Sequence, residues 1–280
     1  MSTLIDIITK QFKGNEDDNA SNNENTEVSV EHPEIVVEKL RDYHPTEDYT
    51  NELKKISSVF GVCDDAFMKK FIDLFGVIKL MHVLDLVQRS GPTQIDQKIK
   101  SEHYLIILTI LHKIIENKCG LEYLQKNYEM EPEESNLLRT FVSYLSLQNE
   151  DANEILMDLI NSLNETRDFA QHCYHQLKEP RPDVNNGLEL LCQLLNTDNS
   201  QNVTLNNSIC VLIKQIVSKL PTDSPLYEDF VINLHDIAFI DKMGIIGENY
   251  KKEDKDVKYV NFVLELYEDL SIRYSKIKIE

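Results

Sequence analysis

The chain has 280 residues and a net charge of −19 at pH 7, and 41% of its residues are hydrophobic. This length suits one large domain or a short array of repeats, and the hydrophobic share is enough to form a buried core. No apolar run reaches the ~18–20 residues that a membrane-spanning helix needs, so no membrane span is predicted. The first residues also lack the basic and small-residue pattern of a signal peptide.

The negative charge is unevenly distributed. Residues 1–60 contain 13 acidic and 6 basic residues, and residues 121–200 contain 15 acidic and 5 basic residues. An acidic surface repels phosphate backbones, which argues against direct nucleic-acid binding and favours a basic protein partner; solubility is the other explanation. The five cysteines form no C-x-x-C pair. Without export signals, this predicts reduced thiols and a cytoplasmic or nuclear location.

The first 32 residues are predicted to be separate from the folded body. Leu4, Ile5, Ile8 and Phe12 recur at helical spacing and predict a short amphipathic helix. Residues 14–31 contain six acids, many Asn and neither Lys nor Arg, so they offer little apolar surface to bury and are expected to be disordered. The predicted body is a single domain over residues 33–280.

The body is predicted to be all-α, with about a dozen helices. Apolar stripes at helical spacing, together with Pro, Gly and capping residues, indicate helix ends. Residues 104–115 are apolar nearly all round, so Ile107 and Leu111 are predicted core positions in a central helix. Gly244 and Gly247 are interpreted as a looser stretch. The expected helices cover residues 34–43, 47–60, 64–75, 76–89, 94–115, 121–128, 132–145, 151–163, 165–177, 187–195, 205–220, 226–240 and 254–274.

Three glycines, Gly76, Gly120 and Gly187, each lead into an apolar-rich run. The spacing of 44 residues from Gly76 to Gly120 falls within the ~40–47 residues of armadillo and HEAT repeats, whereas the next spacing of 67 does not. Residues 105–124 resemble the second helix, polar corner and third helix of an armadillo repeat. This resemblance to the armadillo/HEAT-like superfamily implies a right-handed α-solenoid with a concave groove. An irregular α-helical domain is the alternative.

No motif for nucleotide chemistry or hydrolysis is present in the sequence, so we expect no enzyme activity and no cofactor. His172, Cys173 and His175 are clustered, but Cys173 points away from the helix face that the two histidines share, so no metal site is predicted. Three other histidines within apolar helices are interpreted as hydrogen-bonded structural residues: His82, His112 and His235.

The predicted function is that of a non-enzymatic adaptor, scaffold or assembly factor that engages a protein partner. The chain has no Trp, which argues against the importin-α mode of binding with its ladders of Trp and Asn. An armadillo-type chaperone cofactor that clamps a folded domain, in the manner of a nucleotide-exchange factor, is the alternative. Acidic residues near helix starts stabilise those helices locally, but together they are also the predicted partner-binding residues: Glu129, Glu131, Glu133, Glu134, Glu150, Asp151, Glu154 and Asp158.

Overall fold

The computed structural model describes residues 31–91, 96–127, 137–166, 168–197, 203–253 and 255–277. Within these ranges the regular elements are helices, apart from one isolated bridge between Pro180 and Asn186. The predicted all-α class is therefore confirmed. The predicted N-terminal helix and nearly all of the acidic segment after it lie outside the described residues. In the part of the chain that the structure describes, none of the helices is both long and apolar enough to cross a membrane.

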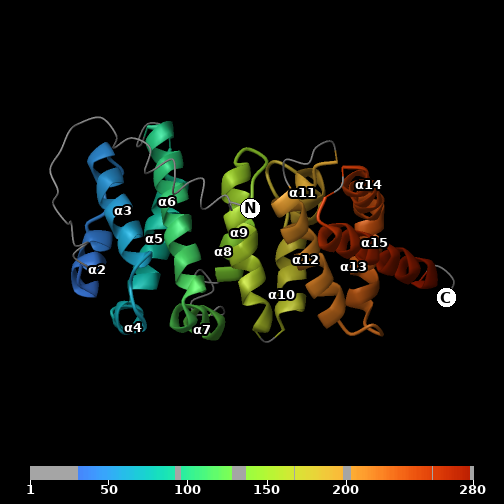
Figure 1. The fold of residues 1–280 in the computed structure, drawn as a ribbon, viewed down its shortest axis with the longest axis horizontal. Coiled ribbons are helices and arrows are strands. Elements are labelled where there is room, and N and C mark those ends of the chain that lie inside the picture. The colour runs from blue at the N-terminus through green and yellow to red at the C-terminus, as the bar shows by residue number, and fades with distance from the viewer. Residues whose placement is uncertain are drawn as a thin grey trace.

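The helices follow one another along the long axis of the molecule, from α2 at one end to α15 at the other (Figure 1). They are α2 (Pro33–Arg41), α3 (Glu47–Phe60), α4 (Asp65–Asp73), α5 (Gly76–Arg89), α6 (Gln97–Glu116), α7 (Lys118–Lys126), α8 (Leu137–Tyr144), α9 (Glu150–Ser162), the short 3-10 helix η2 (Leu163–Glu165), α10 (Phe169–Lys178), α11 (Gly187–Leu194), α12 (Val203–Lys219), α13 (Pro225–Asp236), α14 (Phe239–Lys252) and α15 (Val257–Ile277).

Every third helix packs against the one three places further along the chain. Helix α3 packs on α6, α6 on α9, α9 on α12 and α12 on α15. We call these five the row helices; α3, α6, α9 and α12 stand side by side across Figure 1. Two other α-helices separate each row helix from the next in sequence. Contacts between row helices therefore continue from α3 to α15.

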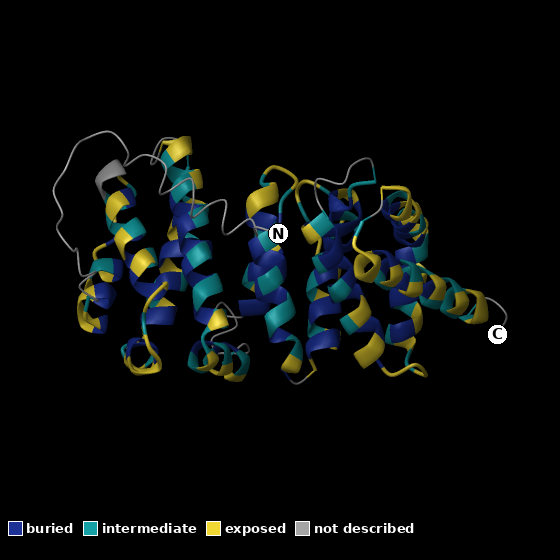
Figure 2. Ribbon diagram, in the orientation of Figure 1, coloured by how far each residue is buried: buried dark blue, intermediate teal, exposed yellow. Residues whose placement is uncertain are grey.

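The hydrophobic core continues along the whole array, where Figure 2 shows buried residues on the inward sides of successive helices. Helix α6 contacts α3, α5, α7 and α9, which explains why its sequence is apolar nearly all round. Ile107 and Leu111 have no exposed surface, so their predicted place in the core is confirmed.

Two row helices are fastened in the same way to the connection that precedes them. In each, the fourth residue is a fully buried asparagine: Asn153 in α9 and Asn206 in α12. The Asn153 amide donates to the Ser146 carbonyl at 2.6 Å and accepts from the Ser146 N–H at 3.0 Å. Asn206 makes the same pair of bonds with Asn196, both at 3.0 Å. Each amide thus satisfies the donor and the acceptor of one loop residue.

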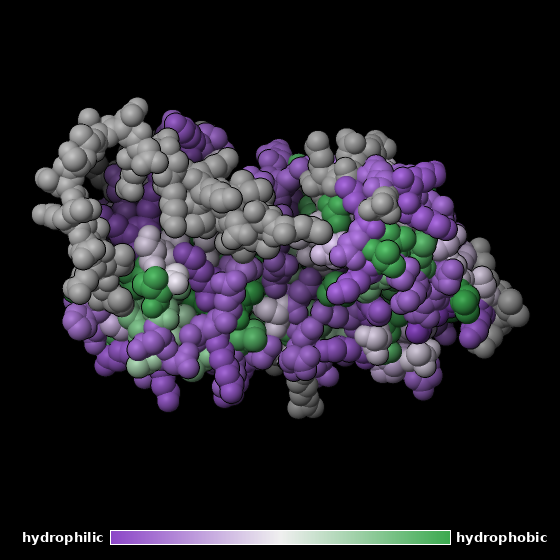
Figure 3. Space-filling view, viewed as in Figure 1, coloured by the Kyte–Doolittle hydropathy of each residue, from purple (hydrophilic) through white to green (hydrophobic). Residues whose placement is uncertain are grey.

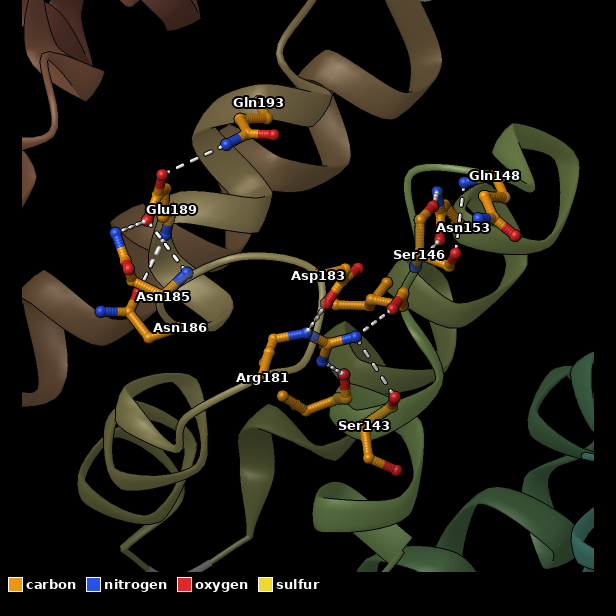
Figure 4. Close-up of polar contacts among 12 residues, drawn as sticks. Ser143, Ser146, Gln148, Asn153, Arg181, Asp183, Asn185, Asn186, Glu189 and Gln193 are labelled. Atoms are coloured by element: carbon orange, nitrogen blue, oxygen red, sulfur yellow. Dashed lines mark hydrogen bonds and ion pairs between the residues drawn. The ribbon is translucent and has the colours of Figure 1, made fainter. Parts of the chain in front are cut away.

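Cationic side chains cover helix C-termini elsewhere in the array. Lys100, the fourth residue of α6, donates to the carbonyls of Gln88 and Ser90 at 2.8 Å each, at the end of α5. Arg181 reaches the end of α8, where it donates to the Val142 carbonyl at 3.0 Å and also to the Leu145 carbonyl (Figure 4). These carbonyls have no partner within their own helix, and a positive charge is favoured at this end of the helix dipole.

Three predicted helix boundaries are wrong, each at a residue with a left-handed backbone. Phe75, Asp168 and Ala238 have φ values of 61°, 57° and 58°. Helix α4 ends before Phe75, which is 64% exposed, and a predicted helix over residues 226–240 is two helices, α13 and α14, with Ala238 between them. Similarly, the predicted helix over residues 165–177 begins only after Asp168. The apolar spacing continues through these corners, so periodicity did not reveal them.

The glycine pattern also has a different meaning from the predicted one. Gly244 and Gly247 do not form a looser stretch: they lie within α14, where a Cβ on Gly247 would come within 2.4 Å of Leu264 in α15. They allow these two helices to approach closely. Gly76 and Gly187 open the helices just before row helices α6 and α12, whereas Gly120 is the third residue of α7, which follows α6 and begins before the predicted start at residue 121. The glycine spacing therefore does not measure a structural period.

Candidate binding face

The predicted acidic contact residues divide into two groups. The first group lies outside the described residues: Glu129, Glu131, Glu133 and Glu134. The second group lies on α9, where Glu150 and Asp151 are exposed in the first turn and Glu154 and Asp158 are half-buried. Asp151, Glu154 and Asp158 are three and four residues apart and share one side of the helix. We call these three residues the α9 acidic stripe.

The acidic stripe faces polar groups from both neighbouring row helices. From α6, the His112 Nε2 atom lies 3.5 Å from Asp158 Oδ2, and its Nδ1 atom lies 3.8 Å from Glu116 Oε1. From α12, the Ser208 hydroxyl donates to Asp158 Oδ1 at 3.3 Å. Figure 3 shows one face of the molecule, on which hydrophilic side chains predominate among the atoms that are not grey. Asp158 therefore joins three row helices at the molecular surface.

Glu154 lies in a setting that disfavours its charge. Burial raises its pKa, and the negative charges of Asp158 and Asp151 raise it further, while a hydrogen bond with Thr204 and the nearby His112 act in the opposite direction. The ionised form is thus disfavoured where it stands. A cation placed beside the acidic stripe would offset this repulsion.

Amide side chains of α9 and α12 have unpaired atoms among the described residues. Asn161 of α9 donates to the Ser208 carbonyl at 3.0 Å, but its own oxygen has no partner among the described residues. Asn207 of α12 is 7% exposed, and within the described ranges neither its oxygen nor its nitrogen is paired; the buried Gln215 oxygen is also unpaired there. An unsatisfied buried polar group costs about 1–3 kcal/mol. These unpaired amide atoms have almost no solvent-accessible surface, so a water enclosed between the helices, or a ligand that displaces the side chains covering them, would be needed to satisfy them.

Local capping sets the positions of these helices. Asp96 caps α6 by accepting from the backbone N–H groups of Lys98 at 2.8 Å and Ile99 at 3.4 Å. Asn149 caps α9 by accepting from Ala152 at 3.3 Å. An acceptor side chain at this position satisfies the free N–H groups of the first turn. Together with the buried asparagines of α9 and α12, these caps fix where the face presents its side chains.

The histidines have varied environments. His82 is exposed, which does not fit its predicted structural role, and His112 belongs to the candidate face. His235 stacks on Tyr274 with ring centroids 3.7 Å apart. On α10, Cys173 is buried and His175 is exposed, which agrees with their predicted placement on different sides. Among the described residues, no three side chains of the types that bind metals gather at one point.

Sequence reasoning found the acidic stripe but not its partners on α6 and α12. Thr204 and Ser208 give no signal of their own, because short hydroxyl side chains are common on helix surfaces. Asn206 and Asn207 interrupt an otherwise apolar run, and adjacent amides in such a run indicate buried hydrogen bonds. That signal identifies a polar site in the core without identifying which of the two amides is paired.

Comparison with known proteins supports the fold alone. No protein-family model matches the chain, and no curated protein matches it. Among solved structures, it is similar to the crystal structure of an engineered protein from the Northeast Structural Genomics Consortium, with a TM-score of 0.54 and 14% sequence identity. The similarity covers 85% of this chain and 80% of that chain.

Proposed function

We propose that the chain is a non-enzymatic scaffold of helical repeats that binds a basic segment of a protein partner on the face formed by α6, α9 and α12. One observation carries this proposal: half-buried carboxylates that repel one another lie on α9, and α9 and its neighbour α12 also carry buried amides without a partner among the described residues. Carboxylates accept hydrogen bonds from Lys and Arg, and amides can bind main-chain groups. A basic polypeptide supplies both kinds of group together.

The arrangement of the helices supports a right-handed α-solenoid of the armadillo/HEAT type as the architecture. Row helices recur at every third place, with two other α-helices between them. The fourth residue of α6, α9 and α12 fastens each helix to the preceding connection. Stacked units of this kind generally present extended surfaces for binding. The row helices would then be the third helices of successive units.

Binding of a basic peptide tests the proposed function. The probe is a fluorescent peptide of alternating Arg and Gly, titrated at low salt, with a peptide of alternating Glu and Gly for comparison. Replacing Glu154→Gln together with Asp158→Asn should weaken binding of the basic peptide about tenfold or more and reduce the salt dependence. The matched control, Glu265→Gln with Glu268→Gln, makes the same charge change at two exposed positions of α15.

The two double variants distinguish binding at this face from attraction by net charge alone. If both double variants weaken binding equally, only net charge attracts the peptide and the proposed face is wrong. Asn207→Ala adds a second criterion, because it should weaken binding while leaving the salt dependence unchanged. Unchanged affinity in the Asn207 variant would show that water, and not the ligand, satisfies the buried amide.

A further inference from the structure

A fully buried histidine joins the first two helices of the described chain to α6. His103, in α6, has no exposed surface. Its Nδ1 atom lies 2.6 Å from the Tyr43 hydroxyl, between α2 and α3, and its Nε2 atom lies 2.8 Å from the Thr50 hydroxyl in α3. The ring also packs edge-on against Tyr43, with centroids 5.6 Å apart. One imidazole therefore holds both hydroxyls at the junction.

The neutral imidazole suits this setting. It has one donor and one acceptor, so Tyr43 can donate to Nδ1 while the Nε2–H group donates to Thr50. Burial raises the pKa of Tyr43, and a charge interaction with Tyr49 raises it further, so the Tyr43 hydroxyl keeps its proton. Burial also lowers the pKa of His103, although the charge of Glu102 and a hydrogen bond with the Thr46 backbone partly oppose this. Both ring nitrogens are therefore satisfied without a charge.

The charged imidazolium form of His103 does not suit this buried setting. With two donors and no acceptor, it would require Tyr43 to turn its hydrogen away, and no other hydrogen bond of the Tyr43 hydroxyl is present in the described chain. Four charged side chains on α2, α3 and α6 pair with one another. Glu102 pairs with Lys54 of α3 at 2.8 Å, and Lys39 of α2 pairs with Glu52 at 2.8 Å. A buried charge without a direct counter-ion is costly.

We propose that His103 makes the packing of α2 and α3 on α6 sensitive to acid, so that its protonation loosens these two helices while the later helices remain folded. The direction follows from linkage. Because folding lowers the pKa of His103 from its ordinary value of 6.5, the stabilisation is fully present above that value. It is lost as the pH falls from about 6.5 through the lowered pKa of the folded state.

Hydrogen exchange measured by mass spectrometry tests the proposal on the full chain. Protection of α2 and α3 is compared with that of α10–α12 at pH 7.5 and pH 5.0, after correction for the intrinsic exchange rate. We expect the ratio of the protection of α2 and α3 to that of α10–α12 to be about tenfold or more lower at pH 5.0 than at pH 7.5. His103→Gln should lower protection at pH 7.5 but abolish its pH dependence. His82→Gln, at an exposed histidine in α5, should behave like the wild type.

Long-range 1H–15N NMR of the wild-type imidazoles keeps the test independent of how the variants fold. We expect His103 to stay neutral until the amide signals of α2 and α3 lose their native shifts. Titration of His103 with those amides unmoved would overturn the proposal. So would an exchange ratio that does not change with pH, or a His103→Gln variant that keeps the wild-type pH dependence.

Discussion

At the scale of single residues, Leu111 occupies the middle of the most heavily packed helix. It has no exposed surface, and α3, α5, α7 and α9 surround its helix. Leu111→Ala removes packing that the neighbouring helices cannot recover by moving inward, so we expect it to lower the free energy of unfolding by about 2–5 kcal/mol. Chemical denaturation followed by circular dichroism measures the change.

Leu86→Ala is the matched control, since Leu86 lies in the neighbouring helix α5 but is 42% exposed. We expect a change within about 0.5 kcal/mol. Equal losses in the two variants would contradict the core position assigned to Leu111.

Also at the residue scale, the hydrogen-bond partners of buried polar side chains could not be predicted from the sequence. Periodicity identifies the buried side of α6 and α9, but it gives no partner for a polar residue there. His103 needs Tyr43, 60 residues away, and Asn206 needs Tyr250 of α14, which lies 3.1 Å from its amide. These contacts form only when the helices pack, so only the apolar core positions were predictable.

At the scale of elements, the corners between helices were harder to predict than the helices themselves. Ser224 and Pro225 were correctly read as the start of α13, because capping residues report their role locally: the Ser224 hydroxyl accepts from Tyr227 at 3.2 Å. Phe75 and Ala238 give no such signal. Neither is a residue type that favours a left-handed backbone, so tertiary packing must impose the corner.

The corner between α6 and α7 depends on a missing side chain. A Cβ on Gly120 would lie 2.2 Å from the Ile114 carbonyl oxygen, and backbone atoms cannot move aside as a flexible side chain can. We expect Gly120→Ala to destabilise the protein by about 1–3 kcal/mol, despite the better helix propensity of alanine. Thermal and chemical denaturation both measure this.

Gly91→Ala is the counterpart, because no atom lies within 4 Å of its added Cβ and its φ is not positive. Stability should stay the same or rise by up to about 1 kcal/mol, since alanine restricts the unfolded chain. A loss at Gly91 as large as that at Gly120 would mean that crowding at the corner is not the cause.

At the scale of the whole molecule, the sequence predicted a helical array but not the geometry of its surface. The spacing of Asp151, Glu154 and Asp158 follows from one helix and was predictable. The contributions of His112 and Ser208 were not, because they come from helices 46 and 50 residues away from Asp158 in sequence. Their place beside α9 follows from the packing of every third helix, which no local pattern encodes.

The contacts between row helices imply that a loss of packing at one end of the array destabilises chiefly the helices near that end. Leu270 has no exposed surface and lies in α15, which packs mainly on α14 and also on α13 and α12. Leu270→Ala should therefore increase hydrogen exchange in α13, α14 and α15 about tenfold or more. Exchange in α3 and α6 should change less than twofold, because in a stacked array each unit is stabilised chiefly by its neighbours. Leu111→Ala, in α6 with α3 packed on one side and α9 on the other, is the comparison, and we expect it to raise exchange on both sides of α6. If Leu270→Ala raises exchange equally from α3 to α15, the molecule unfolds as one cooperative unit and the stacked architecture does not govern its stability.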